Sequence, residues 1–375
     1  MEKILTSPWI WDRSKTLVNL SSSILKHFGV TPFHQSIDEI DTLLDGRKKV
    51  ALFLFDGMGE YNLHVHDVAG KTFLDHRYMT IYSTNPPTTV AATTALLTGK
   101  YPIETGWLGW SLHIEELGIP VDVFPSQSSI DGSNVENGIM FRLCPIKTID
   151  ELMIEKGVKA HMFFQDGVGG RFGGPKTMDD APAMVGDFFQ NQGGQFAYIY
   201  FNNPDGVIHH HGVASKEVDD MIVSAARCVD KFTKENPDVL TMVIADHGLI
   251  DVEYVDIGPF DDLNDCLKEI PSIEGRLASF FLKEGKEEQF LAAMKKHLPS
   301  FALFKKEEIM KNGFFGEGIP CEKAYDFIGD YIGISTDKTI IHDTVHKSNT
   351  YHLHAHHAGP SKEEKEILLA AYNAK

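Results

Sequence analysis

Three long apolar runs form the clearest pattern along this chain, and each is followed closely by an aspartate. The runs cover residues 50–55, 197–201 and 239–245. Continuous apolar segments of this length are typical of strands that are buried on both faces of a parallel sheet. The pattern therefore predicts three strands of one parallel sheet at the centre of the protein.

The aspartates stand at the carboxyl ends of these predicted strands. Asp56 and Asp246 come directly after their runs, and Asp205 follows the second run after a short Asn-Asn-Pro segment. In parallel sheets, ligands gather beyond the carboxyl ends of the strands. We therefore expect the three carboxylates to lie together at one edge of the sheet.

Other periodicities place helices and further strands around this core. Apolar residues at helical spacing predict helices within 13–45, and residues 79–83 predict a second short strand. A run of small residues, 90–98, predicts a buried helix that ends at Gly99. Residues 361–372 are expected to form a further helix. The alternation of strands and helices predicts an α/β fold with a mostly parallel central sheet flanked by helices.

Residues 272–335 are predicted to form a small inserted α+β subdomain. The core would then consist of residues 1–271 together with 336–375. Within the insertion, the sequence predicts a strand at 276–282, a helix at 287–297 and a strand at 326–334.

Composition narrows the range of partners. The 375 residues carry a formal net charge of −18, which argues against nucleic-acid polymers and anionic membrane surfaces as partners. No apolar run approaches the roughly 18 residues of a membrane span, and the N-terminus lacks the features of a signal peptide. The four cysteines form no C-x-x-C pair, which is typical of reduced thiols. We therefore expect a cytoplasmic location.

Histidines accompany two of the three aspartates at spacings that suit metal ligands. Asp205 and His209 are four residues apart, so a helix would direct both side chains toward one point, whereas the two following histidines would face solvent or contact the ligands from outside the site. Adjacent Asp246 and His247 could serve two different ions. With the aspartate of the first run this makes five ligands, and a sixth is expected from the histidine-rich segment 342–357. Zinc, or a similar divalent ion, prefers such nitrogen and oxygen ligands.

A single strand-end aspartate is more often a turn or capping residue. The recurrence of three of them with histidines favours a site for two metal ions. Two ions about 4 Å apart can stabilise both the attacking and the leaving oxygen of an in-line displacement at phosphorus. Thr88 or Thr89, at the start of the small-residue helix, could supply the nucleophile, because a helix N-terminus also favours phosphoryl oxygens. The simpler interpretation of either threonine is an N-cap.

The ordered motifs resemble the alkaline phosphatase superfamily, and most closely its type I phosphodiesterase/nucleotide pyrophosphatase branch. The resemblance extends from about residue 48 to 372 and rests on these segments: Asp56-Gly57-Met58-Gly59, Pro87-Thr88-Thr89-Val90, Leu97-Thr98-Gly99-Lys100-Tyr101-Pro102, Pro204-Asp205 with His209, Ala245-Asp246-His247-Gly248 and His357-Ala358-Gly359. It implies an alkaline-phosphatase-like fold and a hydrolase that acts on phosphoric ester or pyrophosphate bonds of a small phosphate ester or nucleotide.

The resemblance also implies roles for individual residues. Thr89 takes the place of the attacking residue and would form a phospho- or nucleotidyl-threonine. The cofactors would be two divalent ions, zinc in the first instance, with manganese as an alternative. One ion would be held by Asp205, His209 and His357, and the other by Asp56, Asp246 and His247.

The chain departs from the branch in its expected phosphoryl contacts. An asparagine common in the branch falls near Trp110 here, so the contact could come from the backbone N–H of Val90, and Arg171 could enter from the glycine-rich loop 167–175. That loop lacks the lysine of a P-loop, and we interpret it as a flexible loop near the site. No arginine follows Thr89 closely, which favours diesters over monoesters.

Several alternatives remain open at this point. A phosphomonoesterase or a phosphonate hydrolase would use the same scaffold. A phosphomutase is disfavoured by the threonine and the histidine-rich ligand set, and a sulfatase by the lack of a cysteine near residue 89. A catalytically silent, metal-stabilised binding protein is the alternative from a different functional class.

Overall fold

The computed structural model describes residues 12–166, 173–348 and 352–374. Its centre is a six-stranded sheet, in which β1 pairs in parallel with β7 and β8, and β6 pairs in parallel with β7. β17 runs antiparallel to both of its neighbours, so the sheet is mixed but mostly parallel, as predicted. The strands, in spatial order, are β2 (Arg77–Tyr82), β17 (Glu366–Tyr372), β8 (Leu240–Ile244), β1 (Val50–Phe55), β7 (Phe196–Phe201) and β6 (Ala160–Phe164).

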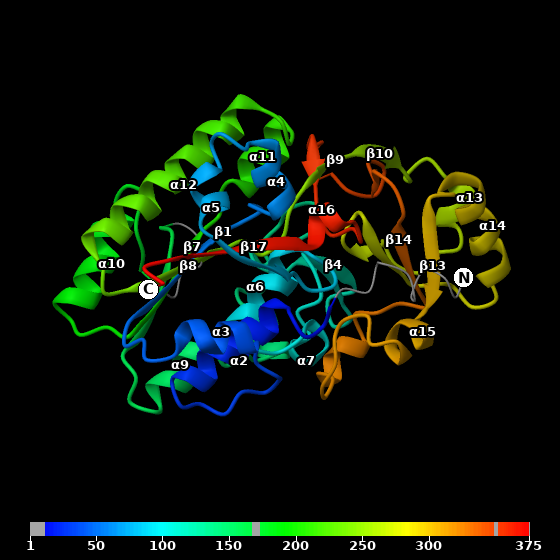
Figure 1. Cartoon of the computed structure of the whole chain (residues 1–375). Coiled ribbons are helices and arrows are strands. Elements are labelled where there is room, and N and C mark those ends of the chain that lie inside the picture. Colours follow the sequence, from blue (N-terminus) through cyan, green and yellow to red (C-terminus); the bar gives the residue numbers. More distant parts are fainter. Residues whose placement is uncertain (1–11, 167–172, 349–351, 375) are drawn as a thin grey trace.

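Helices cover both faces of the central sheet (Figure 1). β1, β7 and β8 are buried along their whole length, which explains their continuous apolar sequences. One face is covered by α2 (Leu17–His27), α3 (Asp38–Leu44), α6 (Thr89–Thr98) and α9 (Ile149–Ile154), and the other by α4 (Glu60–Val65), α5 (Lys71–Asp75), α10 (Ala181–Gln190), α11 (Asp205–His211) and α12 (Lys216–Glu235).

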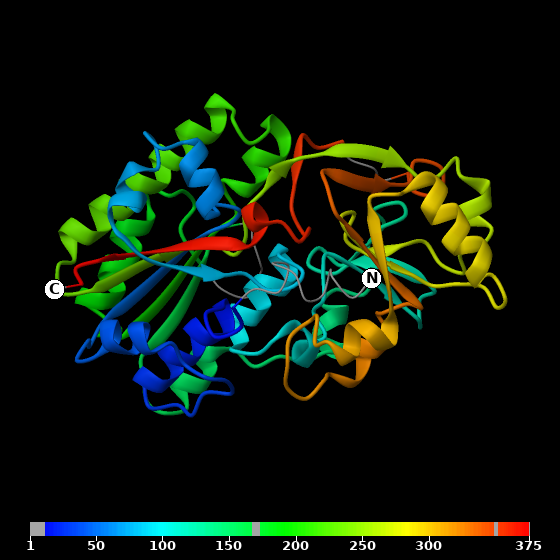
Figure 2. The ribbon, with the colours of Figure 1, turned by 45° about the vertical axis from the view of Figure 1, so that its right-hand side comes forward.

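A second, antiparallel sheet of seven strands lies beside the first (Figure 2). It contains the strands predicted within 272–335, and it also takes in three strands from residues 111–128. The division into a core and an insertion at 272–335 stays a prediction. In spatial order the strands are β13 (Phe301–Lys305), β14 (Tyr331–Ser335), β12 (Leu277–Phe280), β11 (Ser272–Ile273), β3 (Ser111–Ile114), β4 (Ile119–Asp122) and β5 (Gln127–Ser128).

Short elements complete the fold around the two sheets. Two further sheets of two strands each pair β10 with β15 in parallel and β9 with β16 antiparallel. The bounds of these strands and of the remaining helices are α7 (Pro102–Thr105), α8 (Ile139–Leu143), β9 (Ile250–Asp251), β10 (Glu253–Asp256), α13 (Asp261–Asn264), α14 (Glu287–His297), α15 (Lys306–Lys311), the 3-10 helix η1 (Glu322–Tyr325), β15 (Thr339–His342), β16 (Ala355–His356) and α16 (Lys362–Lys365).

The helix predicted over 361–372 is wrong for most of its length. Only α16 is helical, and residues 366–372 form β17. This segment is apolar almost throughout and is buried between β2 and β8, where it pairs with both strands. Pairing on both sides and burial outweigh the modest helix propensity of its alanines and leucines.

The small-residue helix agrees with the prediction. α6 runs from Thr89 to Thr98, its N-cap Thr88 has extended backbone angles, and Gly99 ends it in the left-handed region at φ 66°. Every helical position of α6 except Leu97 is buried. Among the described residues, no helix is long and apolar enough to cross a membrane.

Candidate metal centre

The carboxyl ends of β1 and β8 bring the first group of possible ligands together. Asp56 directly follows β1, and Asp246 and His247 follow β8 after one further residue. One ligand atom from each of the three residues lies within 4.8 Å of the others, and all three side chains are buried. The backbone N–H of Gly57 donates to Asp246 Oδ1 at 3.1 Å, which links the ends of the two strands.

A second group of possible ligands contains Asp205, His247 and His357, again with one atom of each within 4.8 Å of the others. α11 begins at Asp205 and presents His209 one turn later, so that His209 Nε2 lies 3.3 Å from Asp205 Oδ2. The ring of His209 also lies 5.1 Å from that of His357, centroid to centroid. The next residue, His210, is exposed, as expected.

The structure thus brings all six residues predicted as ligands to one edge of the central sheet. The geometry differs in detail from the predicted division, because His247 lies within reach of both groups. His209 adjoins the second group through its contact with Asp205 and is part of neither three-residue cluster.

Burial and the repulsion between neighbouring carboxylates disfavour the ionised form of Asp56 when no cation is bound. Burial, together with the charges of Asp246 and Asp205, raises the pKa of Asp56 well above its usual range. Burial and the neighbouring His247 hold the pKa of His357 well below its usual range. His357 is therefore neutral and able to bind a metal, whereas ionisation of Asp56 is favoured when bound cations supply positive charge.

Buried polar atoms without hydrogen-bond partners also indicate that the site could hold metal ions. Asp205 Oδ1, Asp246 Oδ2 and His357 Nδ1 are buried and have no hydrogen-bond partner among the described residues. Buried polar atoms are normally paired, so the two unpaired carboxylate oxygens in this cluster indicate a missing partner that accepts electron pairs. Divalent ions with nitrogen and oxygen ligands meet this need.

Neighbouring groups hold several of these side chains in place. Tyr200 donates a hydrogen bond from its hydroxyl to Asp56 Oδ2. His209 Nδ1 lies 2.7 Å from the carbonyl oxygen of Ala355, to which it donates, and this leaves Nε2 free to bind a metal. Ala358 donates its N–H to the carbonyl oxygen of Pro87 at 3.0 Å, which ties the segment after His357 to the start of α6.

The two candidate nucleophiles have different surroundings. Thr89 is the first residue of α6, and its Oγ1 lies 3.2 Å from His247 Nε2 and 3.4 Å from Asp56 Oδ1. The hydroxyl of Thr88 instead points to the second sheet and donates to Glu274 Oε1. Only Thr89 therefore faces the cluster of acidic and histidine side chains.

The residues predicted to contact the substrate differ in burial and in position relative to the site. Val90 is fully buried in the first turn of α6, whereas Trp110 is 39% exposed and lines the cavity next to the site. Trp110 also donates its backbone N–H to Glu274 Oε1 at 2.9 Å. Arg171, with most of the glycine-rich loop, lies outside the described residues.

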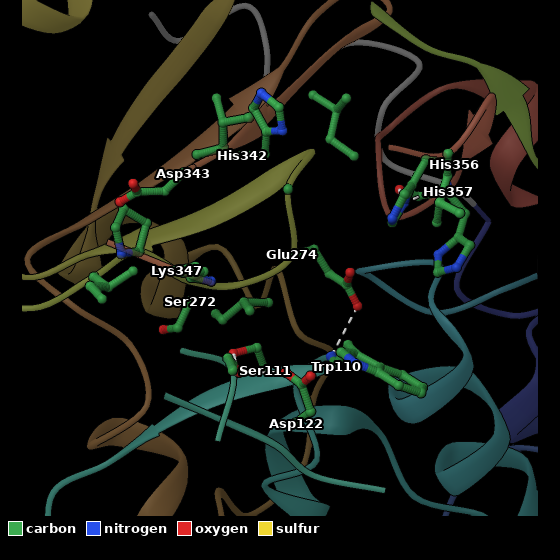
Figure 3. A pocket seen from close by; sticks show the side chains of 18 of the residues that line it. Trp110, Ser111, Asp122, Ser272, Glu274, His342, Asp343, Lys347, His356 and His357 are labelled. Carbon is green, nitrogen blue, oxygen red and sulfur yellow. Dashed lines mark hydrogen bonds between the residues drawn. The ribbon is translucent and has the colours of Figure 1, made fainter. Parts of the chain in front are cut away.

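A cavity of about 550 Å³ opens from Thr89 and the histidines toward the second sheet. Its walls include residues that the sequence did not suggest (Figure 3), among them Glu274, between β11 and β12, and Lys347, after β15. Burial raises the pKa of Glu274 to about 7, although the hydroxyl of Thr88 and the N–H of Trp110 act in the opposite direction. Neither residue stands in a motif, so no sequence signal could have found them.

Comparison with known proteins identifies the family to which this chain belongs. Residues 50–360 match the model of the family described as Type I phosphodiesterase / nucleotide pyrophosphatase. The chain belongs to this family. It is therefore a hydrolase of the alkaline phosphatase superfamily, and its two Asp/His clusters are consistent with the bimetallic site of that superfamily. A comparison with curated protein sequences gives no match.

Solved structures share the fold of this family member at low sequence identity. Murine ectonucleotide pyrophosphatase/phosphodiesterase 5, as an inactive variant in complex with AMP, is 16% identical, with a TM-score of 0.64 over 87% of this chain and 88% of the murine chain. Phosphonoacetate hydrolase from Sinorhizobium meliloti in complex with phosphonoacetate is 14% identical, with a TM-score of 0.65 over 87% of this chain and 90% of that chain.

Proposed function

We propose that this family member is a zinc-dependent phosphodiesterase/nucleotide pyrophosphatase with Thr89 as its nucleophile. The observation that carries the proposal is the position of Thr89 Oγ1, 3.2 Å from His247 and 3.4 Å from Asp56, at the N-terminus of a buried helix. The proposed ligands are Asp205, His209 and His357 for one ion and Asp56, Asp246 and His247 for the other. Two bound divalent ions would favour the alkoxide form of Thr89 and offset negative charge on the phosphoryl oxygens.

The chain's own residues would then divide the reaction into two steps. Thr89 Oγ1 forms a bond to phosphorus while the bond to the leaving oxygen breaks, which gives a phospho- or nucleotidyl-threonine. Water next attacks phosphorus, and the Thr89 oxygen leaves and regains its proton. The free N–H groups of the first turn of α6, that of Val90 among them, would favour the charge of the phosphoryl oxygens.

A nucleotide is the proposed substrate class. The murine structure that shares this fold holds AMP, and the cavity here is within the usual size range of small-molecule sites. We also keep a phosphonate hydrolase as the second candidate, because a phosphonoacetate hydrolase shares the fold over a similar part of the chain.

The central experiment compares substrates, metals and three threonine variants. Thr89→Ala should lower zinc-dependent hydrolysis of bis-p-nitrophenyl phosphate by about 10³-fold or more, since it removes the attacking atom, and should leave the zinc content unchanged. Thr89→Ser should retain measurable turnover. Thr98→Ala is the matched control, because this residue is buried at the other end of α6, where its hydroxyl donates to the carbonyl of Thr94 and accepts the N–H of Lys100, away from the site.

The substrates that the protein cleaves distinguish the proposed function from the alternative functions. Faster turnover of bis-p-nitrophenyl phosphate than of p-nitrophenyl phosphate supports the diesterase, and release of phosphate from phosphonoacetate supports the phosphonate hydrolase. Full activity of Thr89→Ala would overturn the assignment of the nucleophile. Activity that survives complete removal of metal by a chelator would overturn the metal mechanism.

A further inference from the structure

The cavity beside the proposed metal centre has a second polar end. In the view of Figure 3, His356 and His357 lie on one side of the cavity, Lys347 and Ser272 lie on the other, and Glu274 stands between them. At about 550 Å³ the cavity has room for far more than one phosphoryl group. A substrate that fills it would therefore reach from Thr89 toward the Lys347 side.

Lys347 has no partner among the described residues that uses its hydrogen-bond donors. In the described ranges, its ammonium group makes no hydrogen bond and no ion pair. The carboxylates that act on it, Asp122 and Asp343, are engaged elsewhere. Asp122 accepts from the hydroxyl of Ser129, and Asp343 accepts from the backbone N–H groups of Val345 and His346 and from the ring of His346.

This arrangement leaves the ammonium group of the half-buried Lys347 on the wall of the cavity with its three donors available. Burial lowers the pKa of Lys347, and the two carboxylates offset this effect only in part. A cation in such a place is costly unless an acceptor completes its shell. Its position on the cavity wall means that a bound molecule could supply that acceptor.

Ser272 provides an independent sign of a missing ligand at the same end. Its side chain is only 3% exposed, and its Oγ has no hydrogen-bond partner among the described residues. Ser272 belongs to β11, whereas Lys347 follows β15, so two separate elements present unsatisfied polar atoms to one side of the cavity. Of the buried hydroxyls without a partner among the described residues, only that of Ser272 lines this cavity, and together with Lys347 it indicates a group that accepts hydrogen bonds.

We propose that Lys347 and Ser272 form a subsite for a second anionic group of the substrate, a carboxylate or a phosphate. The inference rests on the proposed function, because it assumes that the reacting phosphorus lies at Thr89. The substrate would then be a phosphoric or phosphonic acid derivative that carries a further anion at a distance from the reacting phosphorus. An ammonium group satisfies such an acceptor with charge-assisted hydrogen bonds.

The test uses two series of inhibitors of increasing length. Phosphonoacetate, 3-phosphonopropionate and 4-phosphonobutyrate carry a carboxylate, and methylene-, ethylene- and propylene-bisphosphonate carry a second phosphonate. Each is compared with the alkylphosphonate of the same length, which has no second anion. Dissociation constants are measured by calorimetry on the zinc-loaded full chain and, in parallel, as inhibition of the hydrolysis of bis-p-nitrophenyl phosphate.

We expect at least one dianionic compound to bind the wild-type protein about tenfold more tightly than its matched alkylphosphonate, as charge-assisted hydrogen bonds would provide. The series that contains this compound identifies the anion as a carboxylate or a phosphate. Lys347→Gln should abolish this advantage, Lys347→Arg should keep part of it, and Ser272→Ala should reduce it. Lys338→Gln, an exposed lysine before β15, is the matched control and should change nothing.

Two results would overturn the subsite. One is the absence of any advantage of the dianions in the wild-type protein, and the other is an advantage that persists in Lys347→Gln. A wild-type protein without metal-dependent turnover would refute the proposed function instead. Calorimetry would still report whether Lys347 selects the second anion.

Discussion

Replacement of the arginine in a buried ion pair should test how the second sheet supports the proposed metal centre. Arg276, which directly precedes β12, binds Glu364 of α16 through two contacts, Nε to Oε1 at 2.8 Å and Nη2 to Oε2 at 3.1 Å. The two side chains are 1% and 0% exposed. Glu364 Oε1 also accepts the N–H of Gly359 at 2.7 Å, two residues after His357. The pair therefore links the antiparallel sheet to the segment that carries a proposed ligand.

The perturbation is Arg276→Met, which keeps much of the side-chain volume and removes the charge. It leaves the carboxylate of Glu364 buried without its cation, and breaking a buried pair in this way costs about 3–5 kcal/mol. That loss is a large part of the roughly 5–15 kcal/mol by which most proteins are stable. We expect a corresponding fall in the midpoint of unfolding by guanidinium chloride, measured by tryptophan fluorescence at a fixed zinc concentration.

A double variant isolates the effect of charge. Arg276→Met combined with Glu364→Gln removes both charges and keeps an amide oxygen that can accept the N–H of Gly359. We expect it to recover more than half of the lost stability, because no uncompensated ion remains buried. The reasoning would be refuted if Arg276→Met cost less than about 1 kcal/mol, as for a surface pair, or if the double variant were no more stable than the single one.

Three further changes test separate features. Tyr200→Phe removes the hydroxyl that donates to Asp56, so we expect zinc affinity, measured by competition with a chelator, to fall about 10- to 100-fold; an unchanged affinity would contradict this supporting role. Gly59→Ala would place a Cβ 2.5 Å from the Cα of Gly248, so we expect a loss of about 1–3 kcal/mol in the free energy of unfolding, whereas Gly173→Ala, which meets nothing within 4 Å, serves as the control and should lose little. Burial lowers the pKa of Lys365 to about 7, so between pH 7 and about 10 the unfolded state binds one more proton than the folded state, and this lysine makes stability rise with pH. Lys365→Met should flatten that rise in unfolding curves recorded at pH 7 and pH 9, and parallel curves for the two proteins would show that the lysine is not responsible.

The central part of the fold could be predicted because it depends on local pattern. The strands β1, β7 and β8 are buried on both faces, so each appears in the sequence as a continuous apolar run, and the aspartates stand directly at their ends. α6 was equally clear from its small residues and the glycine that ends it. The failure at β17 has the same cause, because a buried run of leucine and alanine does not distinguish a strand from a helix until its neighbours are known.

The far side of the cavity could not be predicted in this way. Glu274 and Lys347 acquire their positions through the second sheet and the segments that follow it, and this sheet joins strands near residues 111–128 to strands beyond residue 272. Pairing between strands so far apart in the chain does not produce a periodic pattern of apolar residues from which it could be predicted. The second polar end of the cavity, and with it the proposed choice of substrate, is therefore a property of tertiary structure alone.

The order of the strands in the central sheet has a consequence for how the protein matures in the cell. β17 lies between β2 and β8, and His357 reaches the site only when the segment before β17 has docked against Pro87. The proposed ligands Asp56, Asp246 and His247 would thus be synthesised well before His357, which completes the other proposed set. Pairing of β17 with β2 and β8 and completion of the set Asp205, His209 and His357 would therefore depend on the same C-terminal segment.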